Sequence, residues 1–189
     1  MSARAIIGDE LPENAEPIEV HVTALRNLFN AIDPSPLLER DLDPRIEEFI
    51  LGWARSLPRD APLALRVFVD DPPVSENAEN VPRAIRDYFT QQSASARRKL
   101  SQLFSVGRTS LLIGLAALVV AVAIGGLVEK ALGESHAGGI IRETMSIGGW
   151  VAMWRPLEIF LYDWWPIQRE RRLFDRFGRM PIEIRLKGN

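Results

Sequence analysis

A long uncharged run is the strongest feature in the pattern of apolar and polar positions. Residues 111–128 carry no charged side chain on any helical face, and as an α-helix they extend roughly 27 Å. This length matches the hydrocarbon thickness of a bilayer, whereas a core helix of a soluble protein normally keeps a polar face. We therefore predict a transmembrane helix over residues 109–130.

A second apolar segment, residues 144–165, is long enough to return across the bilayer. Tyrosine and tryptophan side chains gather at its C-terminal end, which is typical of a membrane interface. We predict a second transmembrane helix here, with residues 131–143 as a short extracytoplasmic loop. The alternative is a span over 138–154 followed by a segment that lies on the membrane surface.

The second segment contains three charged side chains, Arg155, Glu158 and Asp163. A charge inside a membrane is costly, so we expect Arg155 to pair with the two carboxylates. One interpretation is a structural ion pair at a helix kinked by Pro156. The other is part of a proton or ion path in an assembly.

Small residues recur every four positions on both predicted spans, which favours close helix packing, either within one chain or between two copies. These residues are Ala117, Ala121 and Gly125 on the first span and Thr144, Gly148 and Ala152 on the second.

Strict alternation of apolar and polar residues predicts a strand at 18–22. Alternation at 63–69, which is rich in β-branched residues, and at 182–186 predicts two more. Between the first two, Asp43 caps a helix that starts at Pro44, and a shorter helix is expected over 23–32. Two strands alone make a poor sheet. We therefore predict a three-stranded mixed sheet that includes the C-terminal strand, with an oligomeric sheet as the alternative. Residues 1–17 are expected to form an acidic flexible end, and 18–75 a small α/β domain.

Two basic amphipathic segments flank the apolar runs, residues 81–108 and the helical part of 166–189. Such segments are typical of contact with anionic lipid headgroups. A nucleic-acid or protein-binding patch is the alternative. The basic residues that we assign to headgroup contact are Arg97, Arg98, Lys99, Arg108, Arg169, Arg172, Arg176 and Arg179.

Charge is unevenly distributed, although the net formal charge is only −2. Residues 1–81 are strongly acidic, while 82–108 and 168–189 are basic. Only Lys130 and Arg142 are basic between the two predicted spans. Because short basic segments stay on the cytoplasmic side, we expect a multi-pass plasma (inner) membrane protein with both termini cytoplasmic.

The composition gives no sign of an enzyme. The chain has no cysteine and two histidines, and it lacks phosphate-binding, nucleophile-elbow and paired-histidine motifs. We therefore expect no catalytic residue, no cofactor and no metal. Several carboxylates could hold a divalent cation, but complementing a helix dipole explains them adequately; they are Asp33, Asp41, Asp43, Glu47 and Glu48.

The segments IEVHVTALRNLFNAIDPSPLLERDLDP (18–44) and WRPLEIFLYDWWPIQRERR (154–172) resemble a family of small bacterial inner-membrane proteins with two spans. The resemblance implies a bacterial plasma-membrane location and no particular chemistry. The expected fold is an α+β membrane protein: a two-helix transmembrane hairpin with a small cytoplasmic α/β domain of about three strands and two helices, and basic juxtamembrane helices.

We expect a membrane-anchored adaptor or accessory subunit. The alternative is a subunit of a self-assembling pore or transport complex that uses Arg155, Glu158 and Asp163. The expected partners are anionic lipids and either another protein or further copies of the chain, without nucleic acid.

Overall fold

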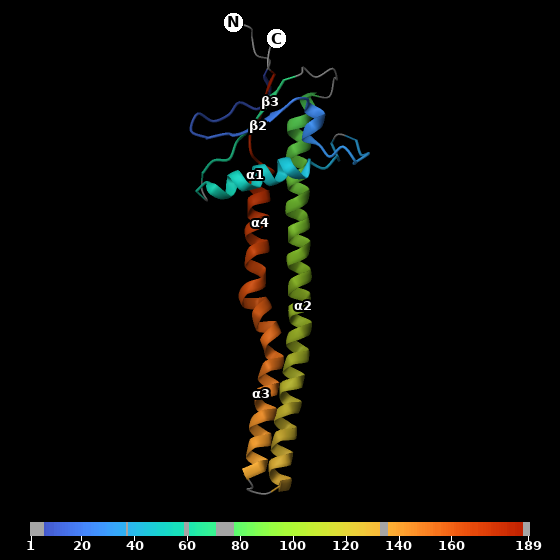
Figure 1. Cartoon of the computed structure of the whole chain (residues 1–189), viewed down its shortest axis with the longest axis vertical. Coiled ribbons are helices and arrows are strands. Elements are labelled where there is room, and N and C mark those ends of the chain that lie inside the picture. The colour runs from blue at the N-terminus through green and yellow to red at the C-terminus, as the bar shows by residue number, and fades with distance from the viewer. Residues whose placement is uncertain (1–5, 37, 59–60, 71–77, 133–135, 187–189) are drawn as a thin grey trace. The chain divides into compact units, whose positions relative to one another are not determined.

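The computed structural model describes residues 6–36, 38–58, 61–70, 78–132 and 136–186 of an α+β protein. The chain divides into two compact units. One unit, Met1–Ala94 with Arg171–Asn189, holds the sheet and is called the head unit. The other, Ser95–Glu170, consists of helices in its described residues and is called the helical unit. Figure 1 shows the elements of both units.

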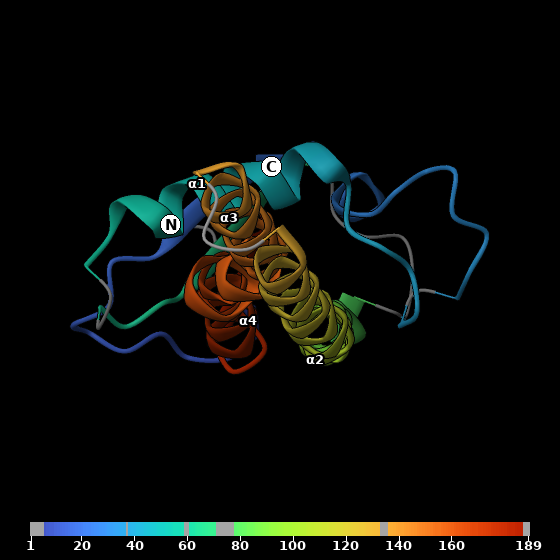
Figure 2. The same cartoon turned by 90° about the horizontal axis from the view of Figure 1, so that it is seen from below.

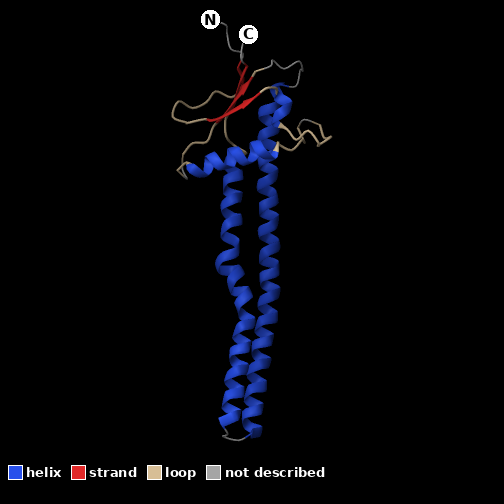
Figure 3. Ribbon diagram, in the orientation of Figure 1, coloured by secondary structure: helices blue, strands red, loops and turns tan. Residues whose placement is uncertain are grey.

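The head unit contains a four-stranded sheet in the order β1-β4-β3-β2. Figure 3 colours its strands red. β2 (Ile18–Val22), β3 (Leu65–Val69) and β4 (Ile182–Leu186) are parallel neighbours, and β1 (Ile6–Gly8) pairs antiparallel with β4. The three predicted strands do share one sheet, in which β4 pairs with β3 and β3 pairs with β2. The prediction of three strands is wrong, because β1 adds a fourth, and the sheet is mixed only through β1. β1 was not predicted, because it lies within the segment 1–17 that we expected to be flexible.

One face of the sheet builds the core of the head unit. Alternate residues such as Ile18, Val67 and Ile184 are buried and cluster with side chains from α1, α2 and α4. Three phenylalanine rings stack inside this core, with ring centroids 4.7 Å apart for Phe89 and Phe177 and 6.2 Å for Phe89 and Phe174. The period of two along each strand therefore divides the sheet into an apolar inner face and a polar outer face.

Helix α1 (Pro44–Ser56) begins where the sequence predicts. The Asp43 side chain accepts a hydrogen bond from the backbone N–H of Arg45 at 2.9 Å, which satisfies a donor that the first helical turn leaves free. The predicted shorter helix over 23–32 is wrong in type and length, because only Leu25–Leu28 form a 3-10 turn (η1). Phe29 is extended and pairs with Leu42, so its backbone cannot continue a helix.

Helix α2 runs without a break from Val81 to Leu132, preceded by the 3-10 turn η2 (Ala78–Asn80). We predicted a juxtamembrane helix and a separate span over these residues, and the structure joins them. Helix α3 begins at His136, so most of the predicted loop 131–143 is helical. An ion pair between Arg142 and Glu129, with 3.5 Å between nitrogen and oxygen, links α3 to α2 where a loop was expected.

The second predicted span, 144–165, is not one regular α-helix. α3 (His136–Glu158) contains Pro156, and a π-helical turn (η3, Ile159–Asp163) leads into α4 (Trp164–Phe177). Proline lacks the N–H that an α-helix uses at that position, and the rare π turns occur mostly as single turns inside α-helices. The π turn begins three residues after Pro156.

Helices α2 and α3 lie side by side in the helical unit (Figures 1 and 2), and glycines make the closest approaches. An added Cβ at Gly114 would meet the carbonyl oxygen of Ala152 at 2.8 Å, and one at Gly149 would meet Leu118 Cδ1 at 2.7 Å. Gly125 faces Arg142. The predicted small-residue ridges are thus only partly correct. Gly125, Ala121 and Ala152 take part, whereas a Cβ at Gly148 would meet no atom within 4 Å.

Among the described residues, one helix passes as a membrane span by length and composition. It is Ala78–Leu132, whose most apolar window has a mean hydropathy of 2.8 and is only 11% buried. α3 does not pass. Its uncharged run, 144–154, is shorter than the 17–25 residues that an α-helical span needs.

Candidate functional site

The candidate site is an exposed apolar surface on both helices of the helical unit, together with the charged groups that bound it. On α2 the exposed side chains include Leu112, Ile113, Leu115, Val119, Val120, Val122, Ile124 and Leu127. On α3 they include Ile147, Trp150, Val151 and Trp154, the last with 71% of its surface exposed. We call these residues the apolar band. The band exists because both helices pack through small residues and leave their large side chains outside.

Arg155, Glu158 and Asp163 form an ionic triad. Arg155 Nη1 lies 2.8 Å from Glu158 Oε2 and 3.2 Å from Asp163 Oδ2. The three-residue spacing places Glu158 on the same helical face as Arg155. Asp163 is eight residues from Arg155 and would be roughly 80° away in a regular α-helix, but it lies in the π turn that alters this angle. The predicted pairing of Arg155 with both carboxylates is confirmed.

The triad lies at one end of the apolar band. Gly114 of α2 faces Ala152 and Met153, and Gly107 faces Ile159 and Phe160. In sequence, Arg155 lies between Met153, which faces Gly114, and Ile159, which faces Gly107. The triad therefore lies next to the segment of α2 between Gly107 and Gly114, where the uncharged run of α2 begins. The ion pair between Arg142 and Glu129 bounds the other end. The sequence could not show this placement, because it depends on how far one helix is shifted along the other.

The eight basic residues predicted to contact lipid headgroups have different surroundings. Arg97, Arg98 and Lys99 are exposed, but they precede Leu111 by roughly 20 Å along an unbroken helix. Arg108 lies directly before the uncharged run, on the same continuous helix. The assignment of these four residues to headgroup contact stays a prediction.

The basic residues of α4 and its end also differ. The Arg169 guanidinium lies 6.0 Å from the centre of the Trp165 ring, and Arg172 is exposed. Arg176 belongs to the head unit, where its Nη2 donates to the carbonyl oxygen of Ala61 at 2.5 Å. Arg179 is exposed in the head unit as well. The contact of Arg176 with Ala61 gives that residue a structural role that the charge pattern did not predict.

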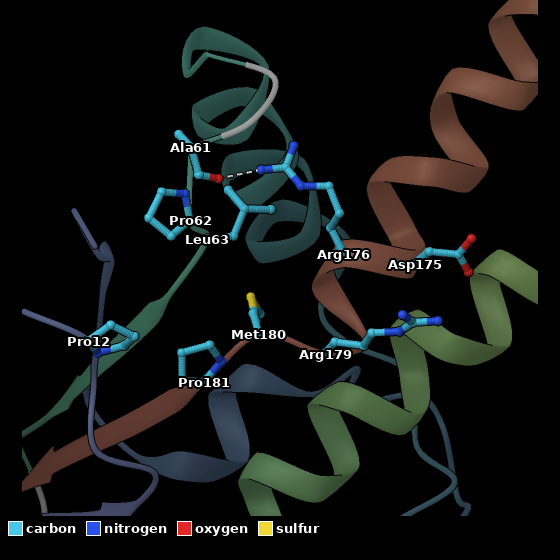
Figure 4. A pocket seen from close by; sticks show the side chains of 9 residues that line it. All are labelled: Pro12, Ala61, Pro62, Leu63, Asp175, Arg176, Arg179, Met180 and Pro181. Atoms are coloured by element: carbon cyan, nitrogen blue, oxygen red, sulfur yellow. Dashed lines mark hydrogen bonds between the residues drawn. The ribbon is translucent and has the colours of Figure 1, made fainter. Parts of the chain in front are cut away.

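Arg176 and Arg179 line a cavity of about 460 Å³ in the head unit (Figure 4). Met180 and Pro181 contribute to the wall, and Asp175 lies beside them. Asp175 already accepts a hydrogen bond from Ser93 Oγ, and Arg176 is bonded to Ala61. Two of the polar side chains of this cavity, Asp175 and Arg176, are therefore already hydrogen-bonded within the head unit.

The outer face of the sheet carries an ionic network that crosses three strands. Arg66 lies between Glu19, at 3.1 Å, and Glu183, at 2.8 Å, while Arg185 contacts Glu183 at 2.8 Å. Burial favours the neutral form of Glu183, but hydrogen bonds from Arg185 and Arg66 outweigh this effect and lower its pKa below the usual value. Next to the network, the rings of His21 and Phe68 stack with centroids 4.5 Å apart.

The carboxylates near the start of α1 have local roles. Asp33 accepts backbone hydrogen bonds from Ser35 and Asp41, and hydrogen bonding lowers its pKa. Glu47 accepts a hydrogen bond from the Tyr88 hydroxyl at 2.8 Å. Burial, followed by this bond, raises the pKa of Tyr88 above its usual range. Among the described residues, no group of three or more histidine, aspartate or glutamate side chains is arranged to hold a metal ion.

Comparisons with protein families, with curated proteins and with solved structures found no match. The resemblance to a family of bacterial membrane proteins therefore stays a prediction, and the α+β fold with its four-stranded sheet and one candidate membrane helix is what the structure establishes.

Proposed function

We propose that the chain is an integral membrane protein whose α2 and α3 cross the bilayer as a hairpin, and that its head unit acts as a cytoplasmic adaptor or accessory subunit without enzymatic activity. The observation that carries the proposal is the apolar band. Soluble monomers rarely expose apolar patches larger than a few hundred Å². Here large apolar side chains face outward on two neighbouring helices, and a lipid environment accounts for all of them.

The distribution of charge supports the participation of α3, although its uncharged run is short. The charged groups of α3 lie near the two ends of the band, where Arg142 pairs with Glu129 and Arg155 pairs with Glu158. Long basic side chains at helix ends extend toward the interface. Paired charges at this depth cost less than charges at the bilayer centre, so a shortened second span remains favourable. The excess of basic residues outside the hairpin supports cytoplasmic termini.

The ionic triad and the number of helices favour an adaptor over the alternative of a pore subunit. The triad neutralises its own arginine within one chain, so its charges require no conduction path. Two helices per chain also enclose no channel unless many copies assemble.

The membrane part is tested by placing a charge on the apolar band. Val119 is 60% exposed within the uncharged run, whereas Val106 is 49% exposed and lies before Arg108. Val119→Arg places a cation near the bilayer centre, at a cost of about 2.5–3.5 kcal/mol, and Val106→Arg is the matched control. In alkaline carbonate extraction we expect wild type and the control to stay with the membranes and Val119→Arg to be depleted from them. Equal retention of both variants contradicts the proposal.

The adaptor role is tested on the full chain purified from native membranes in mild detergent. We expect a monomer or a dimer that retains a second protein in fixed proportion. A closed ring of many copies supports the pore alternative instead. A chain that retains no associate contradicts the adaptor role.

A further inference from the structure

Strand β2 forms an edge of the sheet, and its backbone defines which groups face outward. The N–H of Ile18 donates to Ala64 O at 2.8 Å, and Val22 O accepts from Asp70 N–H at 3.2 Å, so these positions face the β3 side. Because backbone groups alternate along a strand, those of Glu19 and His21 face the free edge. No backbone bond between described residues joins these two positions to a segment beyond the edge.

This edge lacks most of the features that usually prevent edge-to-edge pairing. Proteins protect such edges with very short strands, proline, charged side chains, especially lysine, or bulges. β1, at the opposite edge, has only three residues and ends at Gly8 with a φ of 105°. β2 has five residues, IEVHV, without proline, lysine or a bulge, and its one charged side chain, Glu19, is paired with Arg66. The longer edge of the sheet is therefore the less protected one.

We propose that β2 pairs antiparallel with β2 of a second copy of this chain, about a twofold axis at Val20. In this pairing Glu19 lies opposite His21 of the second copy, and His21 lies opposite Glu19 of the second copy. These are the positions whose backbone groups face outward, so they form the hydrogen-bonded pairs of an antiparallel ladder. Val20 lies opposite Val20 of the second copy and continues the apolar inner face.

The side chains on the outer face complement each other in the same pairing. An imidazole has at least one N–H in either protonation state, and a carboxylate accepts it. His21 is held on the sheet by its ring stack with Phe68. Glu19 binds Arg66 through Oε1, which leaves Oε2 outside that ion pair. A second copy of β2 always places a carboxylate opposite His21 and an imidazole opposite Glu19. A strand of an unrelated protein would have these two side chains in this order only by chance. An eight-stranded sheet across two chains results.

Disulfide crosslinking tests the proposal sharply, because the chain has no cysteine of its own. Hydrogen-bonded antiparallel partners have Cα atoms about 5.5 Å apart, which suits a disulfide, while 19 to 19 and 21 to 21 are diagonal pairs beyond its reach of about 7 Å. Differently tagged full chains with Glu19→Cys and His21→Cys are co-expressed and mildly oxidised in membranes and in detergent. Glu48→Cys, an exposed position on α1, measures random collision.

We expect the mixed 19-to-21 crosslink to exceed the 19-to-19, 21-to-21 and Glu48 crosslinks by about tenfold, since only the mixed pair meets disulfide geometry. A mixed crosslink no stronger than the Glu48 background overturns the proposal. So does a dominant 19-to-19 product, which indicates parallel pairing, or a crosslink to a different protein.

A second measurement uses His21→Glu, which places carboxylates opposite each other at both pairs. We expect dimerisation of the full chain, followed by native mass spectrometry, to weaken about tenfold, while His21→Lys retains it. Equal dimerisation of the two variants contradicts the inference. Neither result depends on whether α2 and α3 cross a membrane, so the two proposals can fail separately.

Discussion

The packing of α2 on α3 predicts different effects for two glycines on the same helix. Gly114 and Gly126 both lie in the uncharged run of α2. A Cβ at Gly114 would come within 2.8 Å of the carbonyl oxygen of Ala152, whereas a Cβ at Gly126 would meet nothing within 4 Å. Gly114→Ala therefore forces two backbones apart, and Gly126→Ala adds a methyl group in open space.

The expected difference in stability between Gly114→Ala and Gly126→Ala follows from what the two substitutions share. Both gain the helix propensity of alanine over glycine, about 0.5–1 kcal/mol, so this contribution cancels in the comparison. What remains is the steric cost at Gly114, about 1–3 kcal/mol for overpacking. Gly149→Ala should cost less than Gly114→Ala, because the closest backbone atom there, Leu118 Cα, is at 3.1 Å rather than 2.8 Å, and the closer Leu118 Cδ1 can move.

The assay is SDS titration of the full chain in detergent, followed by tryptophan fluorescence, to which four tryptophans of the helical unit and one of the head unit contribute. We expect Gly126→Ala to unfold at or above the wild-type SDS fraction and Gly114→Ala clearly below it, with Gly149→Ala between them. If Gly114→Ala and Gly126→Ala unfold together, then α2 and α3 do not pack as described.

Three further predictions concern charged and polar groups. Hydrogen bonds lower the pKa of Glu183 in the folded state. The ionised side chain therefore contributes to stability above the ordinary pKa of about 4.5, and this contribution is lost as the pH falls through the lower folded pKa. Glu183→Gln should flatten the acid side of a plot of unfolding midpoint against pH. The raised pKa of Tyr88 acts in the opposite sense. The contribution of its neutral hydroxyl to stability is full below pH 10.0 and is lost as the pH rises through the folded pKa. Tyr88→Phe should therefore lose less stability than wild type in alkaline solution, and equal alkaline unfolding curves would refute this. Arg155→Leu leaves two carboxylates without their cation, and we expect a lower steady-state amount in membranes on immunoblots; a variant that inserts and folds as wild type removes both interpretations of the triad.

Much of the head unit can be predicted from local pattern. Strands β2 and β4 alternate apolar and polar residues, because one face of the sheet is buried and the other is not, and β3 departs from this only at Phe68. β1 is three residues long, and only its pairing with β4 makes it a strand. The network of Glu19, Arg66 and Glu183 was missed for a similar reason. It depends on the register between strands that are far apart in sequence.

The helical unit shows the same limit. The spacing of Arg155 and Glu158 on one helix predicted their pairing, since side chains three apart meet on a helical face. The level of the triad along α2 could not be predicted, because contacts of Gly107 and Gly114 set the shift between the helices. The π turn after Pro156 was also missed, because a proline inside a helix permits several local adjustments.

The central claim is that α2 and α3 cross a bilayer with the head unit on the cytoplasmic side. Single cysteines at Lys130, near the end of α2, and at Thr90, an exposed residue of the head unit, test it directly in a chain without other cysteines. A membrane-impermeant maleimide added to intact cells should label Lys130→Cys at once and Thr90→Cys only after the membrane is permeabilised. Labelling of both positions in intact cells, or of neither, contradicts the account.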